Sequence, residues 1–252
     1  MELYYRELGE GQPLVLLHGI YGSSDNWLTQ ARMLSSSYHT LALDLRNHGQ
    51  SPHDDAFDYP AMAADVLEFL EAHKLKDPVL IGHSMGGKVA MNLAVAHPEK
   101  VAKLIVVDIA PRSYNMRHDA ILEGLQAIPI DKIKTREEAD EVLAAFVRES
   151  EVRQFLLKNL QRKPGGGFKW KLNLPVIADK SEDIAVGLQF EGKFEKPALF
   201  VRGARSNYVK DEDMDHIRKV FPAAEMETFD TGHWLPAEKP KEFVELVKEW
   251  LG

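Results

Sequence analysis

The chain has 252 residues, which is enough to bury a full hydrophobic core in one large domain or in a core with an insertion. Its formal net charge of −8, without a polybasic run, argues against a nucleic-acid partner, and the lack of cysteine excludes disulfides, a thiolate nucleophile and cysteine-bound zinc. No apolar run approaches the length that spans a bilayer, and the N-terminus lacks a basic region followed by an apolar one, so we expect a soluble cytoplasmic protein.

Short apolar runs, each followed by helical periodicity, recur along the chain and predict a mostly parallel sheet covered by helices. The predicted strands are Leu3 to Glu7, Leu14 to His18, Thr40 to Asp44, Val79 to Gly82, Leu104 to Asp108, Ala198 to Arg202 and Glu225 to Phe229. The first alternates in polarity, which indicates an antiparallel position at the edge of the sheet. Pro240 to Leu251 is predicted as a closing amphipathic helix.

The alternation of predicted strands and helices is interrupted once, over the roughly 85 residues 112–196. These residues carry helical patterns without a convincing buried strand. We therefore predict a core of residues 1–111 and 197–252 with an inserted helical cap over 112–196. Three glycines, 165–167, mark a turn or hinge in the cap, and Phe168 to Val176 is an extended piece or a loop. Each aromatic residue of the cap is expected to be a packing residue, although together they could line a pocket.

A pentapeptide with the sequence Gly-His-Ser-Met-Gly, Gly82 to Gly86, predicts a serine on a sharp turn between a strand and a helix. It follows the apolar run Val79 to Ile81 and precedes a run of helix formers, Lys88 to Ala94. Such a turn crowds the backbone on both sides of the serine, so glycine is needed two residues before it and two after it. Ser84 is therefore the predicted nucleophile.

Among ten histidines, His233 is the candidate general base. It lies just after the last predicted strand, on a loop at the carboxyl edge of the sheet, which is also the edge where Ser84 is expected. Most other histidines are interpreted as surface residues, and His18 and His83 as structural hydrogen-bonding residues.

Several segments together resemble the α/β-hydrolase superfamily, and the similarity covers the whole chain. They are His18-Gly19, Asp44 to Ser51, Gly82 to Gly87 and Gly232-His233. The resemblance implies an α/β-hydrolase fold, with a mostly parallel central sheet flanked by helices and an inserted helical cap. Because proteins with this fold have many functions, Ser84 on its strand-to-helix turn does not by itself identify the reaction.

A narrower resemblance is to the small bacterial esterases of the YbfF type. It rests on three segments, Arg46 to Pro52, Gly82 to Lys88 and Val107 to Pro111. It implies an esterase for short-chain esters, or a thioesterase for acyl-CoA, that works without a cofactor. The resemblance also implies an oxyanion hole made by the backbone N–H groups of Ile20 and Met85, which are fixed before charge develops on the carbonyl oxygen.

The third member of the expected catalytic triad is a carboxylate that accepts a hydrogen bond from His233. In the commonest pattern of the superfamily, this carboxylate is an aspartate that follows the strand after the cap, and the present sequence departs from that pattern. Here the corresponding stretch, Arg202 to Tyr208, contains no carboxylate. Asp108 ends the strand next to that of Ser84, and YbfF-type enzymes are similar in taking their acid from that strand. We assign Asp108 as the acid, with Asp211 as a fallback within an acidic cluster. Asp44 also ends a strand, but Arg46 and the turn beside it suggest a structural ion pair and a turn scaffold.

The predicted reaction is acyl transfer, in which Ser84 attacks a carbonyl, His233 transfers protons and water hydrolyses the acyl-serine. The expected partner is a small ester or thioester. Basic residues in or near the cap could meet the phosphates of an acyl-CoA, or could be ordinary solvated charges; they are Arg112, Arg117, Lys163, Lys169, Lys171 and Arg205. Two alternatives stay open: a carbon–carbon bond hydrolase with the same triad, and a ligand-binding protein that barely turns over.

Overall fold

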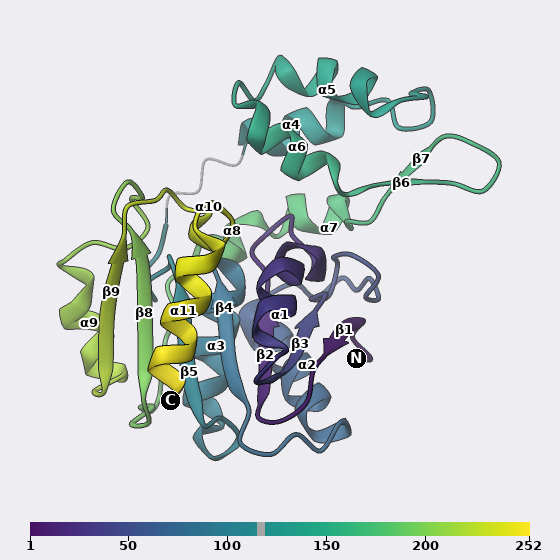
Figure 1. Cartoon of the computed structure of the whole chain (residues 1–252). Helices are drawn as coiled ribbons and strands as arrows, with labels where there is room; N and C mark the ends of the chain where they lie inside the picture. The colour runs from purple at the N-terminus through teal and green to yellow at the C-terminus, as the bar shows by residue number, and fades with distance from the viewer. Residues whose placement is uncertain (115–118) are drawn as a thin grey trace.

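The computed structural model describes residues 1–114 and 119–252, which include a seven-stranded sheet of order β1-β3-β2-β4-β5-β8-β9 (Figure 1). Its strands are β1 (Tyr5–Leu8), β2 (Pro13–Leu17), β3 (His39–Leu43), β4 (Val79–His83), β5 (Lys103–Val107), β8 (Ala198–Gly203) and β9 (Ala224–Phe229). Strand β1 pairs antiparallel with β3 at the edge, as predicted, and the other neighbours pair in parallel.

The central strands consist almost entirely of buried apolar residues because helices cover both of their faces. Residues 14–17 of β2 and 104–107 of β5, for example, are all fully buried. This continuous apolar character made the central strands predictable, and every predicted strand, including the more polar β1 and β9, lies within two residues of the observed one. The predicted fold class is therefore confirmed at the level of the sheet.

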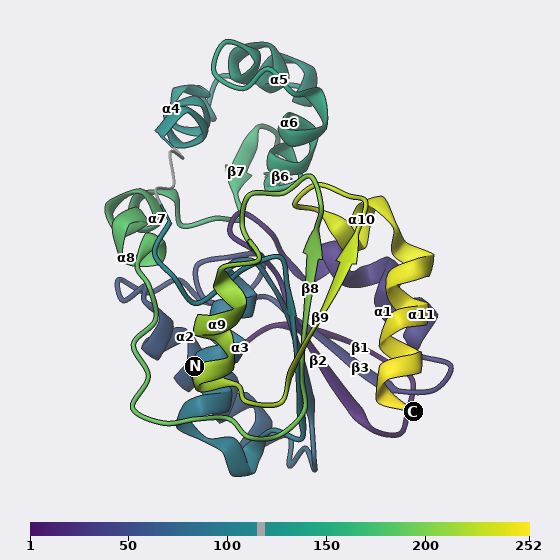
Figure 2. The ribbon, with the colours of Figure 1, turned by 90° about the vertical axis from the view of Figure 1, so that its left-hand side faces the viewer.

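Helices pack on the two faces of the sheet, and Figure 2 shows the sheet nearly edge-on between them. One face carries α1 (Leu28–Leu34) and α11 (Pro240–Leu251), and the other carries α2 (Tyr59–Ala72), α3 (Met85–Ala96) and α9 (Asp213–Val220). The short helices η1 (Ser24–Trp27), η2 (Pro98–Lys100) and α10 (Leu235–Glu238) complete this part of the chain. In the described residues, no helix is both long enough and apolar enough to cross a bilayer.

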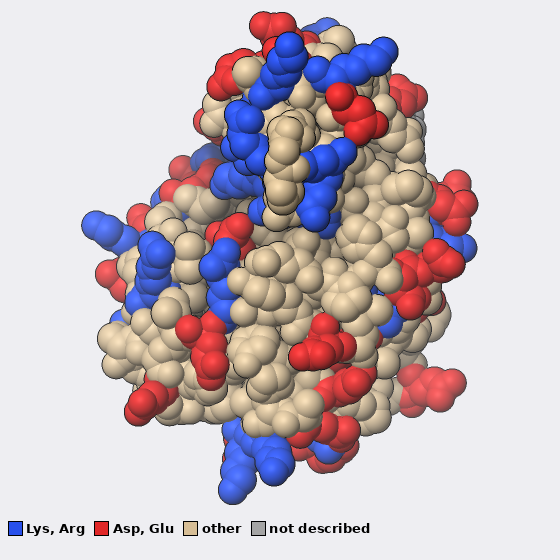
Figure 3. Space-filling view, turned by 90° about the vertical axis from the view of Figure 1, so that its right-hand side faces the viewer, with Lys and Arg blue, Asp and Glu red and all other residues tan. Residues whose placement is uncertain are grey.

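The segment 119–185 lies above the carboxyl edge of the sheet (Figure 1). It contains α4 (Asp119–Ala127), α5 (Arg136–Ala144), α6 (Ser150–Leu157), β6 (Leu160–Arg162), β7 (Phe168–Trp170), α7 (Leu174–Asp179) and α8 (Ser181–Ala185). The three glycines at 165–167 have φ of +91°, +103° and +76° and form the turn of the β6–β7 hairpin, so the predicted turn is confirmed. Figure 3 shows Lys and Arg side chains gathered on the side toward which this hairpin projects.

The chain enters and leaves this segment at one place. The N–H of Tyr114 donates to the carbonyl of Ala185 at 2.8 Å, and the N–H of Leu188 donates to the carbonyl of Pro111 at 2.7 Å. These bonds join the outgoing and returning stretches side by side.

Beneath these two stretches lies Lys88, a buried lysine of α3. Its ammonium donates to the carbonyl of Val186 and lies 5.3 Å and 5.0 Å from the ring centroids of Tyr59 and Tyr114. Burial lowers the pKa of Lys88 to about 8. The side chain therefore ties the helix that follows Ser84 to the returning stretch.

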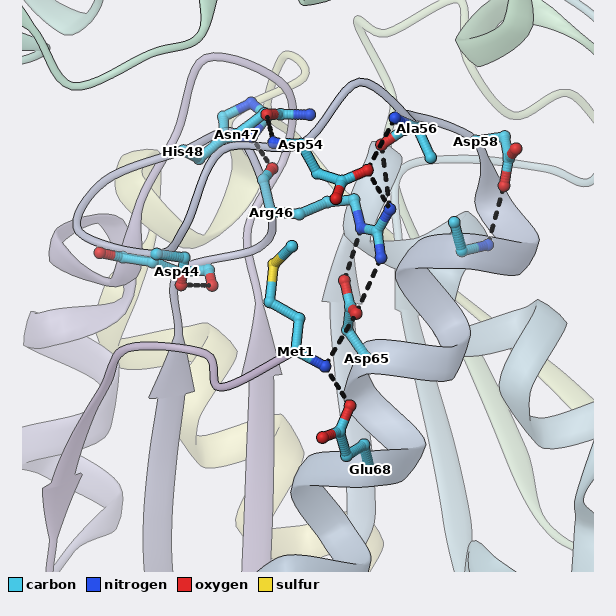
Figure 4. Close-up of polar contacts among 12 residues, drawn as sticks. Met1, Asp44, Arg46, Asn47, His48, Asp54, Ala56, Asp58, Asp65 and Glu68 are labelled. Atoms are coloured by element: carbon cyan, nitrogen blue, oxygen red, sulfur yellow. Dashed lines mark hydrogen bonds and ion pairs between the residues drawn. The ribbon is translucent and has the colours of Figure 1, made fainter.

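A buried ion pair holds the loop after β3 against α2 (Figure 4). The Arg46 guanidinium binds both carboxylate oxygens of Asp65, at 2.6 Å and 2.8 Å. The expected ion pair of Arg46 is thus with Asp65 and not with Asp44. Asp44 instead accepts from the N–H groups of Ser24 and Gln50, at 2.6 Å and 2.8 Å, so it does scaffold the turn.

Candidate active site

Ser84 occupies a strained turn between β4 and α3. Its φ of 52° and ψ of −119° lie outside the regions that L-residues normally adopt. A Cβ on Gly82 would lie 2.2 Å from the carbonyl oxygen of Gly86, and a Cβ on Gly86 would lie 2.4 Å from that of Leu17. Both glycines are therefore required, for the reason that the sequence motif suggested.

His233 and Asp108 meet at the carboxyl edge of the sheet. His233 follows β9, and its Nδ1–H donates to Oδ2 of Asp108 at 2.7 Å. The Asp108 side chain is fully buried, and its Oδ1 accepts from the N–H of Gly203 at 3.0 Å. With the carboxylate ionised, the imidazole carries its hydrogen on Nδ1, which leaves Nε2 as the basic nitrogen.

Ser206 is a member of this group that the sequence reasoning missed. Its hydroxyl donates to Oδ2 of Asp108, the oxygen that also accepts from His233. Ser206 lies in the stretch after β8 where the commonest pattern of the superfamily has its acid. A search of that stretch for any side chain able to hydrogen-bond a carboxylate would have found it.

Asp211 does not approach His233. Its carboxylate binds the guanidinium of Arg202 at 2.6 Å, and 92% of its side chain is exposed to solvent. Of the two carboxylates that the sequence analysis considered for the acid, only Asp108 is brought to the histidine.

Ser84 and His233 line the same pocket, although the described residues contain no hydrogen bond between the two side chains. Such bonds are often long or poorly aligned in a free enzyme and tighten when substrate binds. His83 holds the backbone of His233, because its Nε2–H donates to the His233 carbonyl at 2.8 Å. Burial, together with the neighbouring His233, lowers the pKa of His83 to about 3, so its ring is neutral near pH 7.

The backbones of Ile20 and Met85 approach Ser84 from two sides. Met85 is the first residue of α3, so its N–H has no partner within the helix. A Cβ on Gly19 would lie 3.2 Å from Cβ of Ser84, which shows how closely the loop of Ile20 passes the serine. Ile20 also lines the pocket.

His18, at the base of this loop, uses both ring nitrogens within the protein. Nδ1–H donates to the carbonyl of Gly19 at 2.8 Å, and Nε2 accepts from the N–H of Leu45 at 3.0 Å. Burial lowers the pKa of His18 to about 4. These contacts agree with the structural role expected for it.

The pocket has a volume of about 960 Å³ and opens between the segment 119–185 and the core. Its apolar lining comes from Ile20, Ile121, Phe146, Val147, Val152, Phe155 and Trp234. Its charged lining comes from Asp25, Glu149, Glu151, Glu238 and Lys158. The site therefore offers apolar surface near Ser84 and mostly carboxylates among its charged groups.

The basic residues considered for phosphate contacts are mostly engaged by carboxylates, and two of them, Lys171 and Arg205, pair with the pocket-lining Asp25 and Glu238. None of the five that the structure describes lines the pocket, and Arg117 lies outside the described residues. Four of the five have carboxylate partners: Arg112 binds Asp213, Lys163 binds Asp131, Lys171 lies near Asp25, and Arg205 binds Asp230 and Glu238. Lys169 is exposed on β7. Their positions favour the interpretation as ordinary solvated charges.

A family model described as "alpha/beta hydrolase fold" matches residues 12–148. The "sn-1-specific diacylglycerol lipase ABHD11" of Xenopus laevis is 41% identical over 246 residues, which cover 94% of this chain and 78% of that protein. This chain belongs to the α/β-hydrolase family.

Two further relatives bear on the class of reaction of this α/β-hydrolase. "Esterase YbfF" of Escherichia coli (strain K12) is 36% identical over 241 residues, which cover 95% of this chain and 92% of that protein. The solved structure of a "Marine microorganism esterase" matches with a TM-score of 0.96 and 41% identity over 98% of both chains. The predicted resemblance is therefore confirmed, and the chain is an ester-cleaving serine hydrolase of the carboxylesterase type.

Proposed function

We propose that this α/β-hydrolase cleaves uncharged carboxylic esters with Ser84 as nucleophile, His233 as general base and acid, and Asp108 as the acid of the triad. The observation that supports these roles most strongly is the 2.7 Å hydrogen bond from His233 to the buried Asp108, at a pocket that Ser84 also lines.

In the proposed mechanism, Ser84 Oγ attacks the ester carbonyl carbon while Nε2 of His233 takes the hydroxyl proton. The N–H groups of Ile20 and Met85 donate to the oxyanion, and the imidazolium then protonates the departing alcohol. Water attacks the acyl-serine with His233 again as base. Asp108 keeps the imidazole in one tautomer and stabilises the imidazolium, and the Ser206 hydroxyl orients Asp108.

The lining of the pocket supports an uncharged substrate. Its apolar side chains suit an acyl chain. Asp25 and Glu238 are paired with Arg6 and Arg205, and the other charged lining residues, Glu149, Glu151 and Lys158, leave one lysine against two carboxylates for the phosphates of an acyl-CoA. An ester is therefore proposed in preference to an acyl-CoA thioester. The name of the Xenopus relative, a lipase for diacylglycerol, also denotes an uncharged ester as that protein's substrate.

We further propose that residues 112–196 act as a cap on a core formed by 1–111 and 197–252. Both parts contribute to the pocket: Phe146 and Phe155 come from the proposed cap, and Ile20 and Trp234 from the core. Binding an acyl chain would then bury apolar surface on both.

Labelling by a fluorophosphonate tests the nucleophile. We expect the native protein to be labelled and Ser84→Ala to be unlabelled. The control is Ser36→Ala, which changes a solvent-exposed serine outside the pocket and should be labelled like the native protein. Absence of labelling in the native protein would contradict the proposal and favour a binding protein.

A substrate series tests the ester class. We would compare p-nitrophenyl esters of acetate to decanoate with acyl-CoA thioesters of the same acyl chains. We expect kcat/KM to be at least about tenfold higher for the esters, which corresponds to about 1.4 kcal/mol of transition-state stabilisation. Labelling without ester hydrolysis would favour the carbon–carbon bond hydrolase.

A further inference from the structure

We propose that Tyr208 is a positioning residue for His233, and that Tyr114 holds Tyr208 in place from the point where the cap joins the core. This inference rests on the proposed function, because it concerns the orientation of the histidine assigned there as the base.

The first step is the contact between two rings. The Tyr208 ring lies flat on the imidazole of His233, with centroids 3.9 Å apart and an interplanar angle of 19°. The hydrogen bond from Nδ1 to Asp108 fixes one atom of the imidazole, whereas a face contact restrains the plane of the ring. The two restraints act on different degrees of freedom of the ring, and together they limit the direction in which Nε2 points more than either does alone.

The second step is that Tyr208 is held by both of its peptide groups. Its N–H donates to Oγ of Ser206 at 3.2 Å, and its carbonyl accepts from the hydroxyl of Tyr114 at 2.6 Å. The guanidinium of Arg112 adds a longer bond to the same carbonyl, at 3.4 Å. The position of this loop residue is therefore set by neighbours outside its own backbone.

The third step is that one phenol connects two loops of the site. The Tyr114 hydroxyl accepts from the N–H of Ala110 at 2.7 Å while it donates to Tyr208. Ala110 lies two residues after Asp108 in the chain. Tyr114 thus fixes the loop of the acid relative to the loop that carries the stacked ring.

The fourth step links this arrangement to the cap. The backbone N–H of Tyr114 donates to the carbonyl of Ala185, on the stretch that returns from the cap. A continuous series of direct contacts therefore runs from Ala185 through Tyr114 and Tyr208 to His233. Displacing the cap at this junction would loosen the ring that orients the imidazole.

Substitutions at Tyr208 test the stack. Its hydroxyl makes no hydrogen bond to any residue that the structure describes, so we expect Tyr208→Phe to keep kcat within about twofold of native. We expect Tyr208→Leu and Tyr208→Met to lower kcat, and the rate of fluorophosphonate labelling, by about tenfold or more with KM changed less than about threefold. Thermal unfolding of each variant shows whether it is folded.

A double-mutant cycle tests the role of Tyr114. We expect Tyr114→Phe to lower kcat in the native and Tyr208→Phe backgrounds and to have a smaller further effect in the Tyr208→Leu background, where only its bond to Ala110 still matters. Tyr59→Phe is the matched control, because its hydroxyl also donates to a carbonyl of the returning stretch, that of Ile184, at 2.7 Å. In the part of the chain that the structure describes, neither a hydrogen bond nor a ring contact joins Tyr59 to Tyr208, so kcat should stay unchanged.

A folded Tyr208→Leu protein with native kcat would overturn the inference. So would an equal loss of kcat in Tyr208→Phe and Tyr208→Leu, or an equal effect of Tyr114→Phe on kcat in all three backgrounds. Any of these results with native labelling of Ser84 leaves the proposed function intact. Failure of the native protein to be labelled contradicts the proposed function instead.

Discussion

Ser84 and Asp108 share an unusual backbone conformation, with φ of 52° and 49°. Each directly follows a buried strand, β4 or β5, and each donates its N–H to a carbonyl of the neighbouring strand: Ser84 to Val107 at 3.0 Å and Asp108 to Val201 at 2.8 Å. Left-handed conformations of this kind cost about 1–3 kcal/mol each and persist where the surrounding structure imposes them. The sheet therefore imposes a strained backbone on these two residues, at the edge where both side chains lie near His233.

At the residue scale, Asp108→Asn should lower kcat by about 10³ to 10⁴, because the amide would no longer favour the imidazole tautomer with hydrogen on Nδ1. Steady-state kinetics on a short ester measures the effect. The matched control is Asp211→Asn, which should keep native kcat because the exposed Asp211 carboxylate pairs with Arg202 and not with His233. An equal loss in both variants would contradict the assignment of Asp108.

Side chains that follow a strand or a glycine motif could be predicted from the sequence. Of those that act through loop hydroxyls, Ser206 could be found only by searching the stretch that the family resemblance singles out, and Tyr114 had no such pointer. Ser84 and Asp108 each lie one residue beyond a strand, where an apolar run ends in a polar residue. Ser206 and Tyr114 lie in stretches without periodicity, and their importance depends on which distant atom each hydroxyl reaches. A sequence pattern carries no record of such contacts.

At the element scale, the strand-to-helix turn should not tolerate a methyl group at Gly86. A Cβ there would meet two backbone oxygens, at 2.4 Å and 2.6 Å, so Gly86→Ala should lower the free energy of unfolding by about 3 kcal/mol or more. Gly192→Ala is the control, because its nearest atom would lie 3.7 Å away; we expect a change within about 0.5 kcal/mol. Urea unfolding compares the two, and equal midpoints would contradict this account of the turn.

Elements were predictable where burial dictates the pattern. The inner strands β2, β3, β4, β5 and β8 are largely buried apolar runs, and α11 shows a clear apolar face. The β6–β7 hairpin escaped prediction because its strands have three residues each and are largely exposed. Its turn was predicted from the three glycines, and β7 lies at the start of the stretch Phe168 to Val176 that was predicted as an extended piece or a loop. The end of that stretch is instead part of helix α7. Short exposed strands leave no continuous apolar signal.

At the scale of the whole molecule, three buried histidines should make the fold sensitive to acid. Burial lowers the pKa of His18 to about 4 and the pKa values of His48 and His83 to about 3, from 6.5 in the unfolded chain. The unfolded state therefore binds more protons below pH 6.5, so stability is complete above that pH and is lost as pH falls toward the folded-state values. Near pH 5, these residues should reduce the free energy of unfolding by about 4 kcal/mol per pH unit.

Urea unfolding of the native protein between pH 7 and pH 5 measures this slope. We expect His48→Gln to reduce the slope by about a third, since one of three protons is removed. His216→Gln, which changes an exposed histidine, should leave it unchanged. A stability independent of pH in this range would contradict the neutral state of the three buried rings.

The joining of residues 111–114 with 185–188 has a consequence for how this protein can change. Because the chain departs from the core and comes back at adjacent points, what lies between them can be lengthened, shortened or exchanged without altering the register of any strand in the main sheet. The segment 119–185 supplies 11 of the 30 residues that line the pocket, so this part of the wall could be exchanged as a unit while the part beside Ser84 stays in place. A different segment, with different pocket-lining side chains, could therefore be inserted at this one junction and change the substrates that the pocket accepts.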